Sequence, residues 1–553
     1  MDRFLAKARQ FLKANKKRIV VLKLRRNESS SDGYLSIVEL GIRLALPLEN
    51  LKDEPMASSP ATPPVIVITG AHPRLYNHDL APTAPEGKTW GVFSIFAMWM
   101  SDVHSVGGYT FAASLFFLGL TGWQVLLSMV VGISAVYFLM NLIGRPSLRY
   151  GTPFPVVARI SFGVMGANLA ATLRGIVGIV WYGVQTYFAS KAVQVLVLTW
   201  FPNAESLTHN SIAGLSTLGW FSFAFMWVFQ LLIFLNGMET IRKFIDFCGP
   251  VVYIVMFALA IWILAQTGTS SLNLQLSPSG EGSTLGHMAS AAMLIVAYFA
   301  ALLLNFGDFS RFARDERSMK LGNFLGLPLN FIVFAIITVV VTAGTIQVFG
   351  QAIMDPVLIV EKIGNPWIVA LGSLTFIVAT MGINIVANFV SPAYDISNLN
   401  PERINFRMGG LITSILSVLV CPWLFVSSPQ AITIFVSIFG AILGPMFGIM
   451  VSDYYLVKKQ HVIIDDLYTM STSGSLYFEN GWNRTALIAL AMSGVISIGL
   501  SLLGAYKVIP NVGDWGWLIG ASLGGILYAG LMSFKWRVAF PDKGDWPTKC
   551  SSA

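Results

Sequence analysis

The sequence predicts an all-α membrane protein with about twelve transmembrane helices, and two observations predict it. Apolar residues make up 55% of the 553 positions and charged residues only 12%, whereas soluble domains carry roughly 25% charged residues. From residue 91 onward, apolar runs long enough to span a bilayer follow one another almost without interruption. We place these segments at 91–119, 122–143, 167–199, 216–236, 245–266, 287–306, 322–348, 366–390, 408–426, 430–451, 485–505 and 515–534.

The basic residues predict the orientation of these segments. The predicted outer loops at 200–215 and 267–286 contain no Lys or Arg. We therefore expect both termini in the cytoplasm and the chain in the inner or plasma membrane. The net charge of +8 follows from the basic inner loops and does not indicate a nucleic-acid partner. These loops hold Arg145, Arg149, Arg159, Arg242, Lys243, Arg311, Arg314, Arg317, Lys320, Arg403, Arg407, Lys458 and Lys459.

The apolar segments divide the chain into five regions. Residues 1–55 are charged and contain no run of spanning length. They are either a basic amphipathic arm or not native, since Met56 is a plausible alternative start. The regions are a cytoplasmic N-terminal extension (1–89), a ten-helix core (90–451), a cytoplasmic loop (452–484), helices 11 and 12 (485–534) and a cytoplasmic tail (535–553).

Two segments are unsuited to a continuous helix. The first contains polar residues and paired glycines at 101–108, and the sixth changes character over 298–308. Backbone that breaks inside a bilayer must be buried in protein or line a cavity. Interrupted segments at corresponding positions of two halves indicate a transporter site. Segments 1 and 6 correspond if 90–266 and 287–451 are inverted repeats, so we predict a site where they meet.

The stretch 174–191 places two side chains suited to a flat ligand on one helix. Trp181 and Gln185 are four residues apart, so they leave the same face of a helix. An indole can stack on a flat heterocycle while a primary amide hydrogen-bonds to its edge. An amide facing lipid is unfavourable, so Gln185 should face protein or a water-filled site. The residues also allow an interfacial Trp and a Gln that bridges two helices.

The eighth segment carries Asn384 and Asn388, again one turn apart. Both could point into the bundle and contact a ligand. The alternative for each is a hydrogen bond between neighbouring helices.

Signals for an enzyme are weak. The stretch 520–524 matches the nucleophile elbow of hydrolases, but it lies inside an apolar run, whereas that motif needs a strand–turn–helix context. We expect it to be a site of close helix packing through small residues. The three cysteines (Cys248, Cys421 and Cys550) and the scattered histidines show no metal-ligand spacing. We therefore predict neither a metal site nor catalysis.

A series of short motifs is distributed over residues 85–540. In this order they resemble the nucleobase–cation symporter family, which includes hydantoin, allantoin, cytosine and uracil permeases. The resemblance implies a five-plus-five inverted repeat with two additional C-terminal helices. The motifs are Met98-Trp99-Met100 with Val103-His104, Tyr150-Gly151-Thr152-Pro153-Phe154, Trp181-Tyr182-Gly183-Val184-Gln185, Gly307-Asp308-Phe309, Asn388 with Pro392-Ala393, and Gly444-Pro445 with Asp453-Tyr454-Tyr455.

The resemblance also implies a substrate site, because such permeases hold a flat ring between two aromatic side chains with amides at its edge. Trp181 corresponds to the aromatic residue of helix 3, Gln185 to its amide and Asn388 to the polar contact from helix 8. The helix-6 aromatic position falls on Phe299, where the hydantoin and allantoin members have Trp. We include its neighbour Tyr298 among the expected substrate contacts.

Two departures from the family pattern leave the substrate open. Ser105 falls where relatives place an amide in helix 1, and Phe299 has less stacking area than a Trp. The smaller ring favours a single-ring substrate over a purine.

The cation site departs further. Sodium-coupled relatives use a Ser-Thr pair in helix 8, and the matching residues here are Gly382 and Ile383, which have no side-chain oxygen. Only main-chain carbonyls remain, from Ala379 in helix 8 and from Ser101 and His104 in helix 1. Sodium favours several hard oxygen ligands, so its site should be severely weakened.

Asp102 and His104 are ionisable groups at membrane depth, and such groups often mark proton pathways. They could alternatively cap the ends of the broken helix. Glu239 and Asp308, near the cytoplasmic ends of helices 4 and 6, are interpreted as structural or gating charges.

We therefore predict a secondary transporter, not an enzyme, that imports an uncharged flat heterocycle of the uracil, cytosine, allantoin or hydantoin class, with uracil as the first choice. Import should be coupled to protons through alternating access between helices 1, 3, 6 and 8. Sodium-coupled import and a facilitator or channel for the same solutes stay open. The expected partners are the substrate and the lipid bilayer; no cofactor besides the coupling ion and no protein partner is indicated.

Overall fold

The computed structural model describes residues 63–268, 283–424, 426, 429–509 and 511–539, which belong to one compact unit, Ser58–Ala553. Within these residues the chain is helical, with isolated bridges but no β-strand. The predicted all-α class is therefore confirmed. The segment 1–55, the possible start at Met56 and the end of the tail at 540–553 lie outside the described residues.

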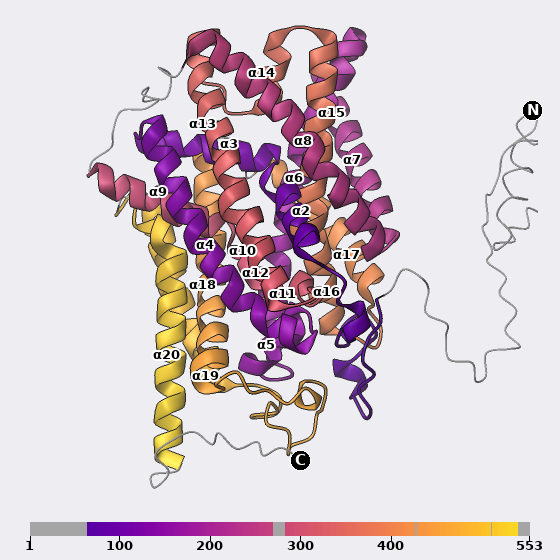
Figure 1. Cartoon of the computed structure of the whole chain (residues 1–553), viewed down its shortest axis with the longest axis vertical. Helices are drawn as coiled ribbons and strands as arrows, with labels where there is room; N and C mark the ends of the chain where they lie inside the picture. The colour runs from indigo at the N-terminus through magenta and orange to yellow at the C-terminus, as the bar shows by residue number, and fades with distance from the viewer. Residues whose placement is uncertain (1–62, 269–282, 425, 427–428, 510, 540–553) are drawn as a thin grey trace, which may run out of the picture. The chain divides into compact units, whose positions relative to one another are not determined.

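Each of the twelve predicted apolar segments forms a helix or a helix pair (Figure 1). By length and composition, eight described helices could cross a membrane, or nine when one bent pair counts as a span. We call the segments spans 1 to 12 in chain order. They are α2 (Val92–Val103) with α3 (Val106–Ser114), α4 (Gly122–Tyr150), α6 (Ala167–Trp200), α7 (Thr217–Leu235), α8 (Met238–Thr267), α9 (Thr284–Tyr298) with α10 (Ala300–Asn305), α12 (Glu316–Phe324) with α13 (Asn330–Phe349), α15 (Pro366–Ile383) with α16 (Ser391–Leu399), α17 (Phe406–Leu419), α18 (Pro429–Ser452), α19 (Arg484–Ala505) and α20 (Gly516–Ala539).

Spans 1 and 6 are both broken, as predicted. Span 1 is interrupted at His104 and Ser105, whose backbone angles are not helical. The Ser105 hydroxyl accepts a hydrogen bond from the Gly108 amide at 2.8 Å, which caps the start of α3. In span 6 the helix bends by 46° between Thr284–Tyr298 and Ala300–Ser310.

Three short helices were not predicted: α5 (Phe154–Phe162), α11 (Gly307–Ser310) and α14 (Pro356–Ile363). The helices α5 and α14 have Pro in their first turn, where the fixed φ of proline suits a helix start. All three contain nine residues or fewer, too few for a clear helical period in the sequence.

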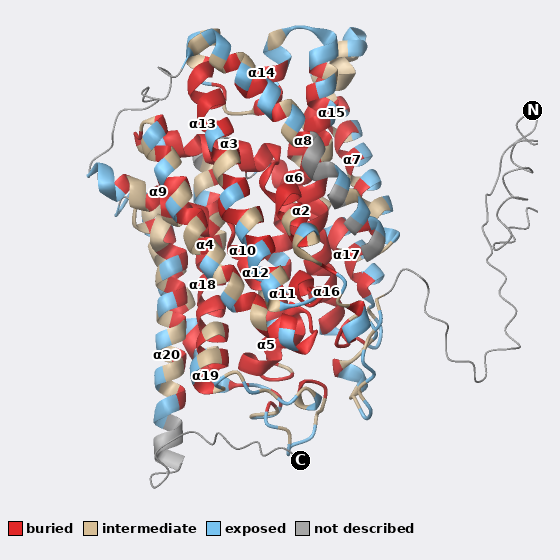
Figure 2. Cartoon of the chain, in the orientation of Figure 1, coloured by how far each residue is buried: buried red, intermediate tan, exposed pale blue. Residues whose placement is uncertain are grey.

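The spans differ in how deeply they are buried (Figure 2). In the most apolar stretch of Pro366–Leu399, 78% of the residues are buried inside the protein, against 28% in Val512–Phe534. Span 8 therefore lies at the centre of the bundle and span 12 at its periphery.

The helices α18 and α20 approach each other through small residues. A Cβ added to Gly524 would lie 2.6 Å from the Pro445 carbonyl oxygen, and one added to Gly448 would collide with the Ala521 carbonyl. Their backbones therefore touch where larger side chains would separate them. The stretch 520–524 is a helix-packing surface, as predicted.

The predicted inner loops meet at one end of the bundle. The Arg145 guanidinium, at the end of α4, lies 3.5 Å from the Glu316 carboxylate at the start of α12. The neighbouring Arg149 donates to the Gln460 carbonyl, after α18, at 3.0 Å. The end of span 2, the start of span 7 and the end of span 10 therefore lie at the same end of the bundle. A chain that crosses the membrane back and forth requires this arrangement.

Two basic residues of these loops are buried. Arg159 donates to the Leu467 carbonyl at 2.7 Å and to the Asn398 side chain at 2.6 Å. Arg311 donates to the Ala81 carbonyl at 2.6 Å. Both are at most 1% exposed, so they tie loops to helices in addition to contributing charge to this face.

Candidate substrate and ion site

Aromatic side chains from four helices meet beside the broken spans. Trp181 of α6 packs edge-to-face on Tyr298 of α9, with ring centroids 5.6 Å apart, and on Phe435 of α18 at 4.8 Å. Tyr298 also stacks on Phe111 of α3, with centroids 4.5 Å apart and planes 9° from parallel. The faces of Trp181 and Tyr298 thus belong to one aromatic cluster, which can stack on a flat ring.

The Gln185 amide lies between this cluster and the break in span 1. Its side chain is buried, and its Oε1 has no hydrogen-bond partner within the described residues. A Cβ added to Gly107 would lie 2.8 Å from that oxygen, so only glycine allows the amide to sit this close to α3. The Tyr298 hydroxyl interacts with the side chains of Ser105 and Gln185. A buried acceptor without a partner is unfavourable, and a ligand N–H would satisfy it.

The aromatic ring of span 6 that meets Trp181 is Tyr298. Phe299 is fully buried, and its ring packs against Phe331 of α13 with centroids 5.8 Å apart. Tyr298, by contrast, is partly exposed. The bend after Tyr298 turns these two neighbours towards different surroundings.

The two asparagines of span 8 have different contacts. The Asn384 amide donates to the Tyr182 carbonyl at 3.0 Å, to the Thr186 hydroxyl at 3.0 Å and to the Gln230 side chain at 2.7 Å. It therefore bridges three helices, as the alternative interpretation held. Asn388 donates to the Asn384 side chain at 3.2 Å. Both residues lie on a π-helical turn, Asn384–Val390, which rotates Asn388 relative to a regular helix.

The ionisable groups of span 1 are buried and face different helices. Neither Asp102 nor His104 forms a hydrogen bond of normal geometry in the described part of the chain, although His104 also interacts with the Asn330 side chain. The His104 ring packs against Tyr253 of α8 at 4.2 Å and Phe334 of α13 at 5.2 Å. Asp102 interacts electrostatically with Tyr298. Asp102 is thus near the aromatic cluster, and His104 lies on the side of spans 5 and 7.

The expected cation ligands lie beside the same break. Ser101, in the last turn of α2, and Ala379 of α15 are both buried. Gly382 and Ile383 are also buried and bring no side-chain oxygen.

The Thr380 hydroxyl, which is not among the predicted site residues, also lies at this break. Its Oγ1 accepts a hydrogen bond from the Val106 amide at 3.2 Å and so links span 8 to the start of α3. Thr380, Asn384 and Asn388 follow one another at intervals of four residues, which places them near one another on one helix face. This spacing could have indicated Thr380 from the sequence.

A buried ion pair between spans 3 and 8 was also not predicted from the sequence. The Arg174 guanidinium lies 3.7 Å from the Asp395 carboxylate, and both side chains are at most 1% exposed. Asp308 accepts a hydrogen bond from the Phe154 amide at 2.8 Å, which ties span 6 to α5. A structural role for Asp308 agrees with this contact, whereas the Glu239 side chain lies outside the described part.

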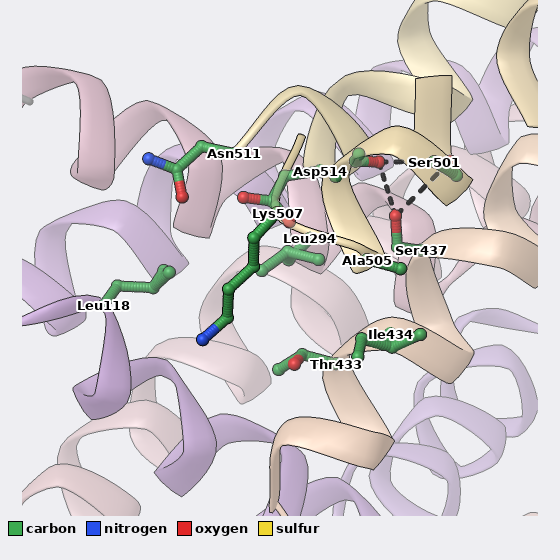
Figure 3. Close-up of a pocket in the computed structure, with 12 residues that line it drawn as sticks. Leu118, Leu294, Thr433, Ile434, Ser437, Ser501, Ala505, Lys507, Asn511 and Asp514 are labelled. Carbon is green, nitrogen blue, oxygen red and sulfur yellow. Dashed lines mark hydrogen bonds between the residues drawn. The ribbon is translucent and has the colours of Figure 1, made fainter. Parts of the chain in front are cut away.

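A separate cavity of about 280 Å³ lies around the connection between spans 11 and 12 (Figure 3). Its lining includes Thr433, Ser437, Lys507 and Asp514. None of the predicted substrate or cation residues lines it, so it is distinct from the site between spans 1, 3, 6 and 8.

Comparison with known proteins gives the family. A family profile described as a permease for cytosine/purines, uracil, thiamine and allantoin matches residues 82–520. The chain belongs to this permease family. Among its relatives, an allantoin permease from Bacillus subtilis is 34% identical over 465 residues, covering 83% of this chain and 93% of the relative. A purine–uracil permease from Arabidopsis thaliana is 34% identical over 447 residues, covering 80% of this chain and 74% of the relative.

A solved structure supports the fold of this permease. A nucleobase-cation-symport-1 family transporter, in a closed conformation with bromovinylhydantoin bound, matches with a TM-score of 0.70 at 22% identity. The match covers 84% of this chain and 96% of that structure. The permease therefore has this family's fold, with ten helices in two inverted repeats, two additional helices and breaks in spans 1 and 6. It is an integral membrane transporter and not an enzyme.

No group of three or more His, Cys, Asp or Glu side chains in the described ranges of the permease could hold a metal ion.

Proposed function

We propose that this permease imports an uncharged, flat nitrogen heterocycle by secondary active transport coupled to protons. The observation that carries the substrate class is the unpartnered Gln185 Oε1 beside the rings of Trp181 and Tyr298. A ring that stacks on these faces and donates an N–H to Gln185 would satisfy both features at once. The names of the relatives, which include allantoin, purine–uracil and hydantoin permeases, agree with this chemistry.

The side chains around the cluster favour a single ring, with uracil as the first choice. The Tyr298 hydroxyl interacts with Ser105 and Gln185. A substrate ring that stacks on the cluster would therefore have these polar side chains close to its edge. We infer that polar groups so close to the aromatic rings suit the edge of a single ring better than that of a fused ring pair. The permease should therefore bind uracil, cytosine, allantoin or hydantoin more tightly than purines.

The residues around the break in span 1 favour a proton over sodium as the coupling ion. Gly382 and Ile383 offer no side-chain oxygen, and the Thr380 hydroxyl already accepts from Val106. A dehydrated sodium ion would have to rely mainly on carbonyls, although it favours several hard oxygen ligands. Asp102 and His104, in contrast, are buried without normal hydrogen bonds, as groups that gain and lose a proton during transport can be.

Purified permease in liposomes tests both parts of the proposal. We expect counterflow exchange of labelled uracil, accumulation driven by an inwardly directed proton gradient, and collapse of accumulation with a protonophore. Replacing sodium with potassium or choline should leave uptake unchanged. Loss of uptake without sodium, together with resistance to a protonophore at clamped voltage, would show sodium coupling. Exchange without accumulation under any ion gradient would instead show a facilitator.

A further inference from the structure

A groove opens between α4 and α12 at the end of the bundle where the basic loops meet. Its volume is about 680 Å³. None of the predicted substrate or cation residues lines it. The groove is lined by Tyr137, Glu316, Arg317, Lys320, Leu321 and Phe324.

Cations outnumber acids around this groove. The Glu316 carboxylate is shared by Lys320, at 2.7 Å, and Arg145, at 3.5 Å. Arg317 adds a third, exposed cation. Together with Asp315, which interacts with Arg317, two carboxylates face three basic side chains, and the groove carries a net positive charge that an anion would balance.

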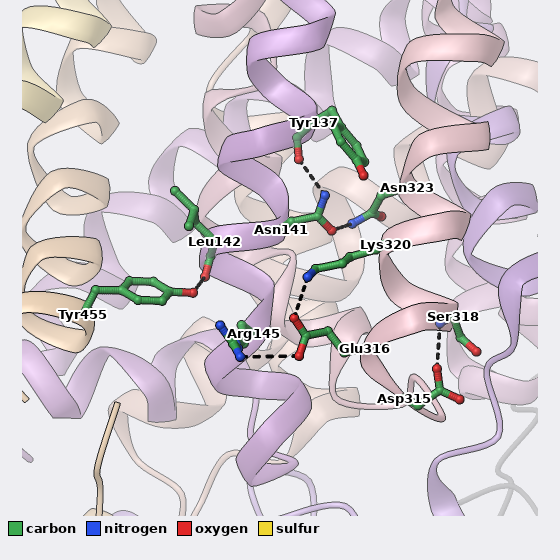
Figure 4. A network of polar contacts seen from close by, with 10 residues as sticks. All are labelled: Tyr137, Asn141, Leu142, Arg145, Asp315, Glu316, Ser318, Lys320, Asn323 and Tyr455. Carbon is green, nitrogen blue, oxygen red and sulfur yellow. Dashed lines mark hydrogen bonds and ion pairs between the residues drawn. The ribbon is translucent and has the colours of Figure 1, made fainter. Parts of the chain in front are cut away.

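A second acid beside these cations is Asp315. Its carboxylate accepts a hydrogen bond from the Ser318 amide at 2.7 Å and caps the start of α12. In Figure 4 this pair points away from Glu316 and Lys320. Asp315 also interacts electrostatically with Arg317, so it offsets part of the charge there, and three cations against two carboxylates leave the groove with a net positive charge.

The remaining walls of the groove are apolar and rigidly held. The rings of Tyr137 and Phe324 pack edge-to-face with centroids 5.9 Å apart. Behind them, Asn323 donates to the Asn141 side chain at 3.0 Å, which fixes α12 against α4. Phe324 is 47% exposed. Because α4 and α12 belong to membrane spans, this exposed apolar surface faces acyl chains.

We propose that the groove binds the phosphodiester head group of an anionic phospholipid. The phosphate lies against Arg317 and Lys320, and the acyl chains lie along Leu321 and Phe324. Basic pockets between transmembrane helices recognise anionic head groups in this way, with apolar surface below and charge above. Guanidinium and ammonium donors form charge-assisted hydrogen bonds to phosphate oxygens.

The position of the groove gives the lipid a role in the fold. The helix α4 packs along α9 of broken span 6, and α12 packs along α2 of broken span 1. A lipid held between α4 and α12 therefore joins the two helices that support the broken spans. This role does not depend on which heterocycle or ion the permease carries.

The test uses the purified full-length chain, stripped of lipid, and native mass spectrometry with phosphatidylglycerol and phosphatidylcholine of identical acyl chains. The double variant Arg317→Gln/Lys320→Gln should bind phosphatidylglycerol about 30-fold more weakly, since each basic side chain near an anionic surface contributes roughly a factor of five. The matched control Arg403→Gln/Arg407→Gln removes the same charge from exposed positions just before α17 and in its first turn. It should change the affinity by less than about twofold.

Three results would overturn the proposal. One is equal binding of phosphatidylglycerol by the groove variant and the control. Another is equal binding of the two lipids by the wild-type chain. The third is displacement of the lipid by millimolar inorganic phosphate, which would show a site for free phosphate. If the double variant does not fold, Arg317→Gln alone should weaken binding about fivefold, and wild-type affinity in that variant would overturn the proposal equally.

Discussion

The two broken spans differ in what their breaks present to the site. Span 1 is interrupted at His104 and Ser105, and buried ionisable groups without normal hydrogen bonds stand there. Span 6 only bends at Phe299, whose amide still donates to the Ile295 carbonyl at 3.2 Å. The bend brings aromatic rings, and no charge, into the site.

We infer from this difference that the two breaks have different roles in transport. An interruption frees main-chain groups and allows charged side chains to stand in the bilayer, which suits a coupling ion. A bend mainly redirects side chains: Tyr298 reaches the site while Phe299 packs behind it. We therefore expect mutations at span 1 to change ion dependence and mutations at span 6 to change substrate affinity.

The largest effect is expected on the helix that faces both breaks. Trp181→Ala and Gln185→Ala should each lower the uptake rate roughly 100-fold or more, since they remove the stacking surface and a buried amide oxygen that has no partner within the described residues. Labelled uptake at low substrate concentration, normalised to the amount of permease in the membrane, measures this. As controls, Trp123→Ala and Gln194→Ala remove a Trp and a Gln side chain at other positions and should retain uptake. Wild-type uptake kinetics in Trp181→Ala and Gln185→Ala would show that the substrate binds in another place.

Removing the ionisable groups of span 1 should uncouple transport. In Asp102→Asn and in His104→Gln we expect counterflow exchange to persist, while accumulation driven by a proton gradient is lost. Wild-type uptake should rise as the external pH falls, because lower pH increases both proton occupancy and the inward gradient. Proteoliposomes at several external pH values measure both. Glu361→Gln, which removes an exposed carboxylate of α14, serves as the control. If both span 1 variants still accumulate substrate under a pH gradient, these groups are excluded as proton carriers.

The two aromatic residues at the bend of span 6 can be separated. Tyr298→Phe should raise the KM roughly fivefold to tenfold, because it removes the hydroxyl that interacts with Ser105 and Gln185. Phe299→Leu should leave the KM within about twofold but lower the unfolding temperature, since it reduces packing against Phe331. Concentration-dependent uptake and thermal unfolding distinguish them. A larger KM change in Phe299→Leu than in Tyr298→Phe would reverse the assignment.

The smallest expected effect probes the contact of α3 with span 3. In Gly107→Ala the new methyl group would lie 2.8 Å from Gln185 Oε1 and displace the amide. A roughly threefold rise in KM should follow, because the side chain can rotate but no longer occupies its best position. Gly494→Ala, which adds a methyl group in open space, is the control. An unchanged KM in Gly107→Ala would mean that substrate does not depend on this amide position.

Most of the fold could be predicted from the sequence, because each membrane span requires a long apolar run and such runs are visible in the sequence. The glycines and polar residues at 101–108 also revealed the break in span 1. The helices α5 and α14 could not be predicted in this way, since they are too short to show a period and depend on contacts with loops. The end of span 9 was placed too late, because the apolar run continues beyond Leu419, where α17 ends.

The site was harder to predict than the fold. The i, i+4 spacing of Trp181 and Gln185 was visible in the sequence and places both beside the breaks. Which aromatic residue of span 6 meets Trp181 depends on the direction of the bend, and packing of Tyr298 on Phe111 determines it. Such a contact joins residues far apart in the chain, and no local pattern records it.

The close seam between α18 and α20 has a practical consequence for following transport. Phe435 of α18 packs on Trp181, so any opening of the site on that side must move α18. Because Gly448 and Gly524 bring the two backbones into contact, we expect α20 to move with α18. A spin label at the exposed Ile526 of α20 would then report gate movement from outside the bundle, without disturbing the binding site. If the distance between this label and one on α6 is the same with and without substrate, α20 does not move together with α18.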